Sequence, residues 1–409
     1  MSRSEALRAD ARAMEGELVE LRHRLHRQPE VGLQLPRTQE TVLAALEGLG
    51  LEVSTGTTTT SVTAVLRGGR RGPAVLLRGD MDALPVQEET GLDFSSEVEG
   101  VMHACGHDLH TAMLVGAARL LHAHRETLAG DVVFMFQPGE EGWDGAGHML
   151  AEGVLDAAGQ RVSSAYGIHV MAAMNPRGQF TTRPGTLMAA SDELRVTVRG
   201  AGGHGSAPHL ARDPVTVAAQ LVGDLQTMVT RTFDVFDPVI LTVGLFHAGT
   251  KRNIIPDEAT FQATVRTFSA EARDRMREAS VLLCRSVAAG YGLEADAQYL
   301  EEYPVTVNAP DHAAFAAAVA TEVFGADRYA PRVFPHAGSE DFSRVLEAVP
   351  GCYLFLGATV GEDWSTAPNN HSPRAQFSDE VLADGVLLHT ELAVRALERD
   401  AAGTVAATG

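Results

Sequence analysis

The sequence predicts an α/β protein with a mixed sheet and helices on both faces, together with a smaller α+β domain inserted into it. Its 409 residues exceed what one ordinary core needs. Short apolar runs such as 74–78 and 131–136, typical of strands buried on both faces, end in polar clusters. The segment 190–302 follows a β-α-β-β-α-β order, which is typical of a ferredoxin-like fold. We expect one domain from 1–189 and 303–409, and an inserted domain from 190–302.

The composition limits the partners and the compartment. A net charge of −20 argues against nucleic acid or an anionic membrane, because phosphate binding needs a surplus of Lys and Arg. The simpler reading of this charge is an acidic, solvated surface. Three scattered cysteines are too few for a disulfide framework, and neither a signal-type segment nor a run of 18 apolar residues occurs. These features predict a cytoplasmic protein that has neither nucleic acid nor a membrane as its partner.

The N-terminal third begins with helices and continues with strands. Apolar residues at helical spacing predict a helix over 4–27, and Thr38 can cap a second one that runs to Gly48. Strands are expected at 61–67 and 74–78, and the second ends in the sequence Arg-Gly-Asp-Met-Asp. Open α/β sheets bind ligands beyond the carboxyl ends of their strands, so Asp80 and Asp82 are candidate site residues, although such a pair also occurs in ordinary turns.

The stretch 103–110 has the composition of half a metal site. Within eight residues it contains His103, Cys105, His107 and His110, beside Asp108, which can orient an imidazole. Packing does not explain that density of ligand-type side chains. One loop rarely supplies a whole coordination sphere, so further ligands must lie elsewhere.

The next strand also ends in polar residues. After an expected helix over 111–122 and a strand over 131–136, Glu140 and Glu141 are adjacent carboxylates. Because side chains alternate along an extended backbone, one of them can bind a metal while the other holds a water. A pair of glutamates is usually solvated surface, but the position directly after an apolar strand favours a site.

Two single histidines are ambiguous by themselves. His169 lies in an apolar segment, 162–170, and His371 lies in a polar loop before a final helix expected at 379–399. A histidine among apolar residues is more often a hydrogen-bonded core residue than a ligand. Only the wider pattern makes these two candidates.

The inserted domain is expected to contain strands at 192–199, 238–246, 257–268 and 293–300, with helices at 214–231 and 271–289. Its glycine-rich loop, 200–209, carries His204. Such a loop has too much glycine for a rigid element and suits a substrate contact.

Eight motifs together resemble a known family. They are Arg78 to Pro85, His103 to Asp108, Gln137 to Gly142, Gly167 to Val170, Gly202 to His204, Asn253 to Pro256, Gly338 to Phe342 and Asn370 to Ser372. In this order they resemble the aminoacylase/carboxypeptidase family of two-metal amidohydrolases, over residues from about 15 to 400. The Cys-Gly-His-Asp form is similar to the branch of hippurate hydrolases, N-acyl-amino-acid amidohydrolases and indole-3-acetyl-amino-acid hydrolases. The resemblance implies a metallopeptidase-type catalytic domain with an inserted lid.

The resemblance also implies roles for individual residues. The implied metal ligands are Cys105, His107, Glu141, His169 and His371, and the implied general base is Glu140. Other branches have a histidine where Asp80 stands. We expect Asp80, Asp82 and Asp108 to lie beside the metal ligands, where they could orient imidazoles, rather than to bind the metal themselves. On the lid, His204, Asn253 and Arg266 match residues that bind the scissile carbonyl or the substrate carboxylate, and Gly338 is a further substrate contact. A thiolate favours zinc, although manganese, cobalt or nickel also fit.

The expected reaction is hydrolysis of the amide bond of an N-acyl amino acid by a metal-activated water. In relatives the lid histidine reaches the partner protomer's site, which implies a homodimer, or a tetramer built from dimers. A dipeptidase or carboxypeptidase on the same scaffold is an alternative. A thiol hydrolase with Cys105 as nucleophile is less favoured, because Glu140 and Glu141 would then have no task. A binding protein without turnover is disfavoured by the intact Glu140. The stretch Met171 to Asn175 departs from the family pattern and leaves the acyl pocket undefined.

Overall fold

The computed structural model describes residues 2–408, and the side chains of 403–408 are not described. The chain divides into two compact units: unit 1 is formed by 1–185, 307–333 and 344–409, and unit 2 by 186–306 and 334–343. Unit 2 thus contains the segment 190–302 and, in addition, a short stretch from later in the chain.

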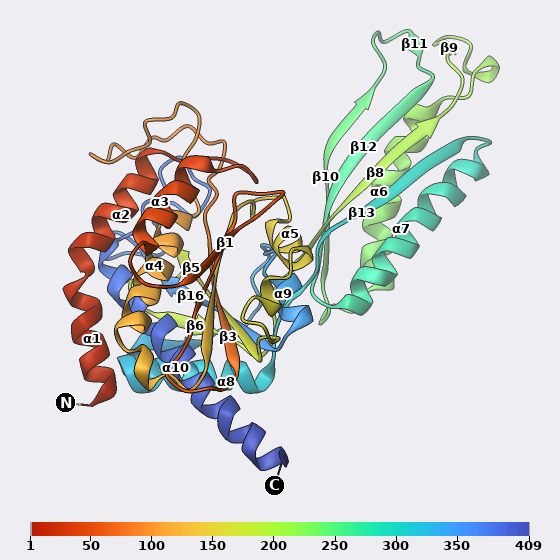
Figure 1. The fold of residues 1–409 in the computed structure, drawn as a ribbon. Coiled ribbons are helices and arrows are strands. Elements are labelled where there is room, and N and C mark those ends of the chain that lie inside the picture. The colour runs from red at the N-terminus through yellow and green to blue at the C-terminus, as the bar shows by residue number, and fades with distance from the viewer. Residues whose placement is uncertain (1, 409) are drawn as a thin grey trace. The chain divides into compact units, whose positions relative to one another are not determined.

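The helices and strands of unit 1 are shown in Figure 1. The helices are α1 (Arg3–Ala13), α2 (Glu15–Arg27), α3 (Pro36–Leu46), α4 (His107–Ala123), α5 (Gly145–Ala151), α8 (Pro310–Phe324), α9 (Ser343–Ala348) and α10 (Leu382–Thr408). The strands of its large sheet are β1 (Glu52–Thr55), β2 (Val62–Leu66), β3 (Ala74–Asp80), β4 (Asp131–Gln137), β5 (Ser164–Met171), β6 (Phe180–Thr182), β15 (Tyr329–Pro331) and β16 (Gly351–Gly357). Two short strands, β7 (Gly185–Met188) and β14 (Thr306–Asn308), pair with each other.

The large sheet is mixed, as the sequence predicts. Its strand order is β1-β2-β4-β3-β5-β16-β6-β15. The central strands β4, β3, β5 and β16 are parallel, whereas β2 pairs antiparallel with β4, and β6 with β16. Every residue of β3 and of β5 is buried, which explains the continuous apolar run 74–77 at the start of β3. Helices α4 and α10 pack on β3 and β5, so their apolar faces close the core of unit 1.

The expected single helix over 4–27 is wrong. The chain forms α1 and α2, with Met14 between them at φ −89° and ψ −6°. The reason is tertiary: α1 packs chiefly on α10, whereas α2 packs on α4. Thr38 is also not a cap, because α3 begins at Pro36, and Glu30 accepts hydrogen bonds from the Thr38 amide and hydroxyl.

Unit 2 has the expected β-α-β-β-α-β order. It consists of β8 (Ala190–Arg199), α6 (Pro214–Thr232), β10 (Val239–Ala248), β12 (Glu258–Thr267), α7 (Ala270–Gly290) and β13 (Glu294–Tyr303). The antiparallel sheet has the order β10-β12-β8-β13, and α6 and α7 lie side by side along it (Figure 1). Two very short strands, β9 (Gly203–His204) and β11 (Ile254–Ile255), pair with each other.

Candidate metal centre

The candidate site lies where parallel strands of unit 1 end. Because β3, β4 and β5 run in the same direction, their carboxyl ends meet at one edge of the sheet. Asp80 ends β3, Glu140 and Glu141 follow β4, and His169 lies near the end of β5. This edge of the sheet therefore collects side chains from distant parts of the sequence.

Two loops complete the cluster. Cys105 lies two residues before α4, and His107 is the first residue of that helix. Between them Gly106 has φ +82°, and a Cβ at this position would lie 2.5 Å from the Val170 side chain, so only glycine lets the loop approach β5. The amide of His371 donates a hydrogen bond of 2.8 Å to the Ala104 carbonyl. This bond holds the His371 loop against the Cys105 loop.

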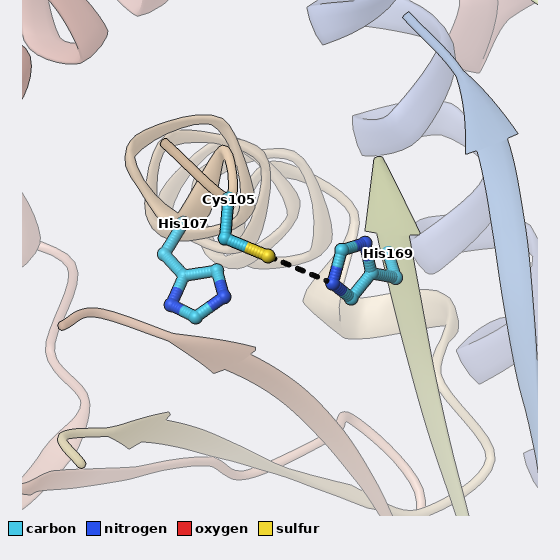
Figure 2. Close-up of side chains that lie close together, drawn as sticks. All are labelled: Cys105, His107 and His169. Carbon is cyan, nitrogen blue, oxygen red and sulfur yellow. Dashed lines mark hydrogen bonds between the residues drawn. The ribbon is translucent and has the colours of Figure 1, made fainter. Parts of the chain in front are cut away.

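The side chains form overlapping groups with the spacing of metal ligands. Within each group, the potential ligand atoms lie within 4.8 Å of one another, and the groups are Cys105-His107-His169, Cys105-Glu141-His371 and His107-Glu140-Glu141. Figure 2 shows the first group, with the Cys105 sulfur pointing to the ring of His169 at 3.5 Å from Nε2. On the other side, His371 Nε2 lies 3.1 Å from Glu141 Oε1. Cys105 belongs to two groups.

The environment of these side chains fits a divalent cation. His107 is fully buried, yet neither ring nitrogen has a hydrogen-bond partner, and the nearest carboxylates, Asp80 and Asp82, lie 3.5 and 3.4 Å away. A buried imidazole is normally hydrogen-bonded or bound to a metal. His169 donates from Nδ1 to the Val170 carbonyl at 2.7 Å, which leaves Nε2 free to face Cys105. Thiolate, imidazole and carboxylate are the donors that zinc and other late divalent ions prefer.

The side chains of the cluster together stabilise a positive charge placed among them. Hydrogen bonds to Cys105 and Glu141 raise the pKa of His371 to about 10. Burial alone would raise the pKa of Glu141, but the hydrogen bond with His371 and the nearby His107 lower it. The carboxylate of Glu141 is therefore available as a ligand.

Asp82 fixes the backbone of Glu140 and Glu141 through hydrogen bonds. It is buried, and its two carboxylate oxygens accept hydrogen bonds from the amides of Glu140 and Glu141, each at 3.0 Å. Its Oδ1 also lies 3.4 Å from His107 Nδ1. Asp82 thus holds the glutamate loop and also faces the candidate ligand His107.

Asp108 lies elsewhere than expected. Its Oδ2 accepts hydrogen bonds from Arg22 at 2.7 Å and from His26 at 2.8 Å, both on α2, so it is not the partner of a ligand imidazole. Burial alone would raise the pKa of Asp108, but Arg22 and His26 hold that pKa well below its usual range. Asp108 therefore anchors the N-terminus of α4 to α2, because its partners come from that helix.

Arg78 and Asp80 form a buried ion pair beside the cluster. Arg78 donates to Asp80 at 2.6 Å, to the Gln137 side chain at 2.9 Å and to the Tyr353 hydroxyl at 3.1 Å. Burial alone would raise the pKa of Asp80, but Arg78 and the neighbouring histidines hold it well below its usual range. Sequence reasoning gave Arg78 no role. The signal was a charged residue directly after the apolar run 74–77.

The expected substrate contacts lie in unit 2, in separate places. His204 on β9 pairs with Ile254, and the amide of the next residue, Gly205, donates to the Asn253 carbonyl at 2.9 Å. Arg266 lies near the far end of β12, where it donates to Ser191 at 2.7 Å. The Gly338 amide donates to His336 Nδ1 at 3.0 Å.

Comparison with known proteins identifies the family. Residues 76–395 match the model for the peptidase family M20/M25/M40. The chain belongs to this family. Thermostable carboxypeptidase 1 of Saccharolobus solfataricus is 38% identical over 395 residues, which are 96% of this chain and 98% of that protein. N-acetylcysteine deacetylase of Bacillus subtilis is 34% identical over 388 residues, 95% of this chain and 98% of that protein.

A solved structure agrees with this assignment. A dinuclear metal-binding M20 peptidase from Bacillus subtilis superposes with a TM-score of 0.80 at 33% identity, covering 95% of this chain and 99% of that chain. The M20 chain described here is a hydrolase of the amidohydrolase/peptidase type, which confirms the resemblance noted in its sequence. Among its described residues, no helix is long and apolar enough to cross a membrane.

Proposed function

We propose that this M20 hydrolase cleaves the amide bond of N-acyl amino acids with two divalent cations, zinc being favoured. The observation that carries the proposal is the position of Cys105, which is shared by two groups of potential ligands beside Glu140. The relative named N-acetylcysteine deacetylase supports the N-acyl substrate class.

The ligand set follows from the groups. Cys105, His107 and His169 form one group of proposed ligands, Cys105, Glu141 and His371 form another, and together these residues would hold the two cations. When bound, the cations would polarise the amide carbonyl and lower the pKa of the attacking water. Because metal binding requires deprotonated ligands, loading should release protons and weaken at acidic pH.

Glu140 is the proposed general base. It is buried, its amide is fixed by Asp82, and its carboxylate lies within 4.8 Å of the ligand atoms of His107 and Glu141. From this position it takes a proton from the attacking water and passes it to the nitrogen of the leaving amino acid. The carbon–nitrogen bond then breaks, giving a carboxylic acid and a free amino acid.

Unit 2 supplies the proposed substrate contacts as a lid. Arg266 has a planar donor group suited to the carboxylate of an amino acid, and Gly338 lies in the same unit. His204 and Asn253, suited to the developing oxyanion, lie beyond the start of β12, whereas Arg266 lies near its end. Eight residues of strand span roughly 26 Å, so one lid cannot place both ends on one amide bond. We therefore propose a homodimer in which His204 serves the partner's site.

Two alternative functions can be distinguished from this proposal by experiment. Since one relative is named a carboxypeptidase, cleavage of peptides is the second candidate. A thiol hydrolase would use Cys105 with His169 as the base, since these atoms are 3.5 Å apart. In that case Glu140 and Glu141 would have no role.

The test is a substrate screen with metal-reconstituted protein. Apoprotein prepared with EDTA should be inactive and should recover with zinc, manganese, cobalt or nickel. N-acetyl amino acids, hippurate and indole-acetyl conjugates should then be hydrolysed faster than dipeptides. Activity that resists EDTA but is lost with iodoacetamide would refute the metal mechanism, and a preference for dipeptides would refute the substrate class.

A further inference from the structure

His110 is a buried histidine that the mechanism above does not use. Its side chain is 1% exposed, and both ring nitrogens are engaged. Nδ1 lies 2.5 Å from Asp80 Oδ1, and Nε2 lies 2.8 Å from the Val170 backbone nitrogen. The two partners belong to different strands, β3 and β5.

The hydrogen-bond partners determine the state of the ring. A backbone N–H can only donate, so Nε2 is the acceptor from Val170 and carries no proton. Nδ1 then carries the proton and donates a hydrogen bond to the Asp80 carboxylate. The second carboxylate oxygen of Asp80 accepts from Arg78. The group Asp80-His107-His110 has the spacing of a metal site, but His110 has no free lone pair.

The position of His110 in the sheet explains what these bonds do. The pairing of β3 with β5 runs from Val75–Ser164 to Arg78–Gly167 and stops there. Beyond that point the Val170 amide is bonded to the ring of His110 on α4. His110 therefore links the end of β5 to the end of β3 beyond the last backbone pair of these two strands, while the other side of β5 stays paired with β16 as far as Met171.

The link made by His110 also affects His169, a candidate metal ligand. The Val170 carbonyl accepts the hydrogen bond from His169 Nδ1, and this bond leaves His169 Nε2 directed at Cys105. One residue, Val170, is thus held by His110 through its amide and holds His169 through its carbonyl. The rings of His110 and His169 also touch edge to face, with centroids 4.8 Å apart.

We infer that His110 is a positioning residue for the metal centre, since it fixes the end of β5 so that His169 presents Nε2 beside Cys105. The inference rests on the proposed metal site. Groups that orient metal ligands typically contribute 10- to 100-fold to metal affinity.

The experiment compares three variants with the wild type. His110→Phe keeps a ring against His169 but removes both hydrogen bonds. His110→Asn keeps a donor near Nδ1, and His110→Gln keeps an acceptor near Nε2. A matched control is His312→Phe, because His312 is a half-buried histidine of α8 whose ring is bonded to the Tyr166 hydroxyl instead.

The readouts are zinc affinity, from competition with a chelator, and the visible absorption spectrum of the cobalt-loaded protein. We expect roughly 10- to 100-fold weaker zinc binding for His110→Phe, a smaller loss for the Asn and Gln variants, and an altered cobalt spectrum. His312→Phe should bind zinc as the wild type does. If His110→Phe does not fold, the zinc affinities and cobalt spectra of His110→Asn and His110→Gln test the positioning role instead.

The outcomes separate this inference from the proposed function. His110 variants that bind zinc within about threefold of the wild type, with an unchanged cobalt spectrum, would overturn the positioning role while leaving the metal site intact. A wild-type protein that binds no divalent metal would overturn the proposed site and this inference with it.

Discussion

Replacing Asp82 tests whether its carboxylate holds the loop that carries Glu140 and Glu141. Both oxygens of this buried carboxylate accept backbone amides, from Glu140 and from Glu141. Hydrogen bonds to charged groups contribute about 1.5–3 kcal/mol each, so Asp82→Ala should destabilise the metal-free protein by about 3–6 kcal/mol. For a unit of this size, that corresponds to a fall in Tm of roughly 6–12 °C.

Activity should fall more steeply than stability implies. The two amides that are released carry the proposed general base and a proposed ligand, and a misplacement of about 1 Å can cost roughly 10²-fold in rate. Asp82→Asn is not conservative, because it keeps one acceptor but turns an NH2 group toward the other amide. We expect it to lose about half the stabilisation lost by Asp82→Ala and most of the activity.

The assays are calorimetry of metal-free protein and hydrolysis of an N-acetyl amino acid at full metal loading. Asp234→Ala is the control, because the exposed Asp234 accepts a single amide, that of Phe236, and exposed contacts of this kind contribute little. A Tm for Asp82→Ala within 2 °C of the wild type, with turnover within tenfold, would refute the reasoning.

Three further predictions concern single charges. Glu140→Gln should lower kcat by about 10²- to 10⁴-fold, while metal content measured by mass spectrometry stays at the wild-type level, and retained turnover would remove its role as base. Arg78→Met should destabilise metal-free protein by about 3–5 kcal/mol in calorimetry, because it leaves the buried Asp80 carboxylate poorly paired, and a loss below 1 kcal/mol would contradict this. The depressed pKa of Asp108 means that its stabilisation is complete above its unfolded pKa of about 4 and is lost as the pH falls below that value. Asp108→Asn should therefore reduce the slope of unfolding free energy against pH near pH 3 by about 1.4 kcal/mol per unit, and an unchanged slope would count against it.

Much of the candidate site could be predicted from the sequence, because it follows the ends of parallel strands. The apolar runs that form β3 and β4 identified the positions of Asp82, Glu140 and Glu141, since residues just past such strands meet at one edge of the sheet. His371 could not be found in this way. It lies in an irregular loop, where only the resemblance to a family singled it out.

The remaining roles depend on partners that local patterns do not reveal. Asp108 looks like the partner of a neighbouring imidazole, but its hydrogen bonds go to α2, more than 80 residues earlier in the chain. The role of His110 depends on a backbone amide of β5, which any residue except proline would provide. The break at Met14 likewise depends on α1 and α2 packing on different helices.

The strand order has a consequence for how the protein is made. Strand β16, near the end of the chain, lies between β5 and β6, and the loop with His371 follows it. A ribosome has therefore synthesised more than 350 residues before the centre of the sheet can be filled. Cys105 and His107 leave the ribosome long before His371, so binding of a metal by all the proposed ligands would require almost the whole polypeptide. A chain that stops before residue 371 would contain the thiol and two imidazoles of the proposed site but would lack its last proposed ligand.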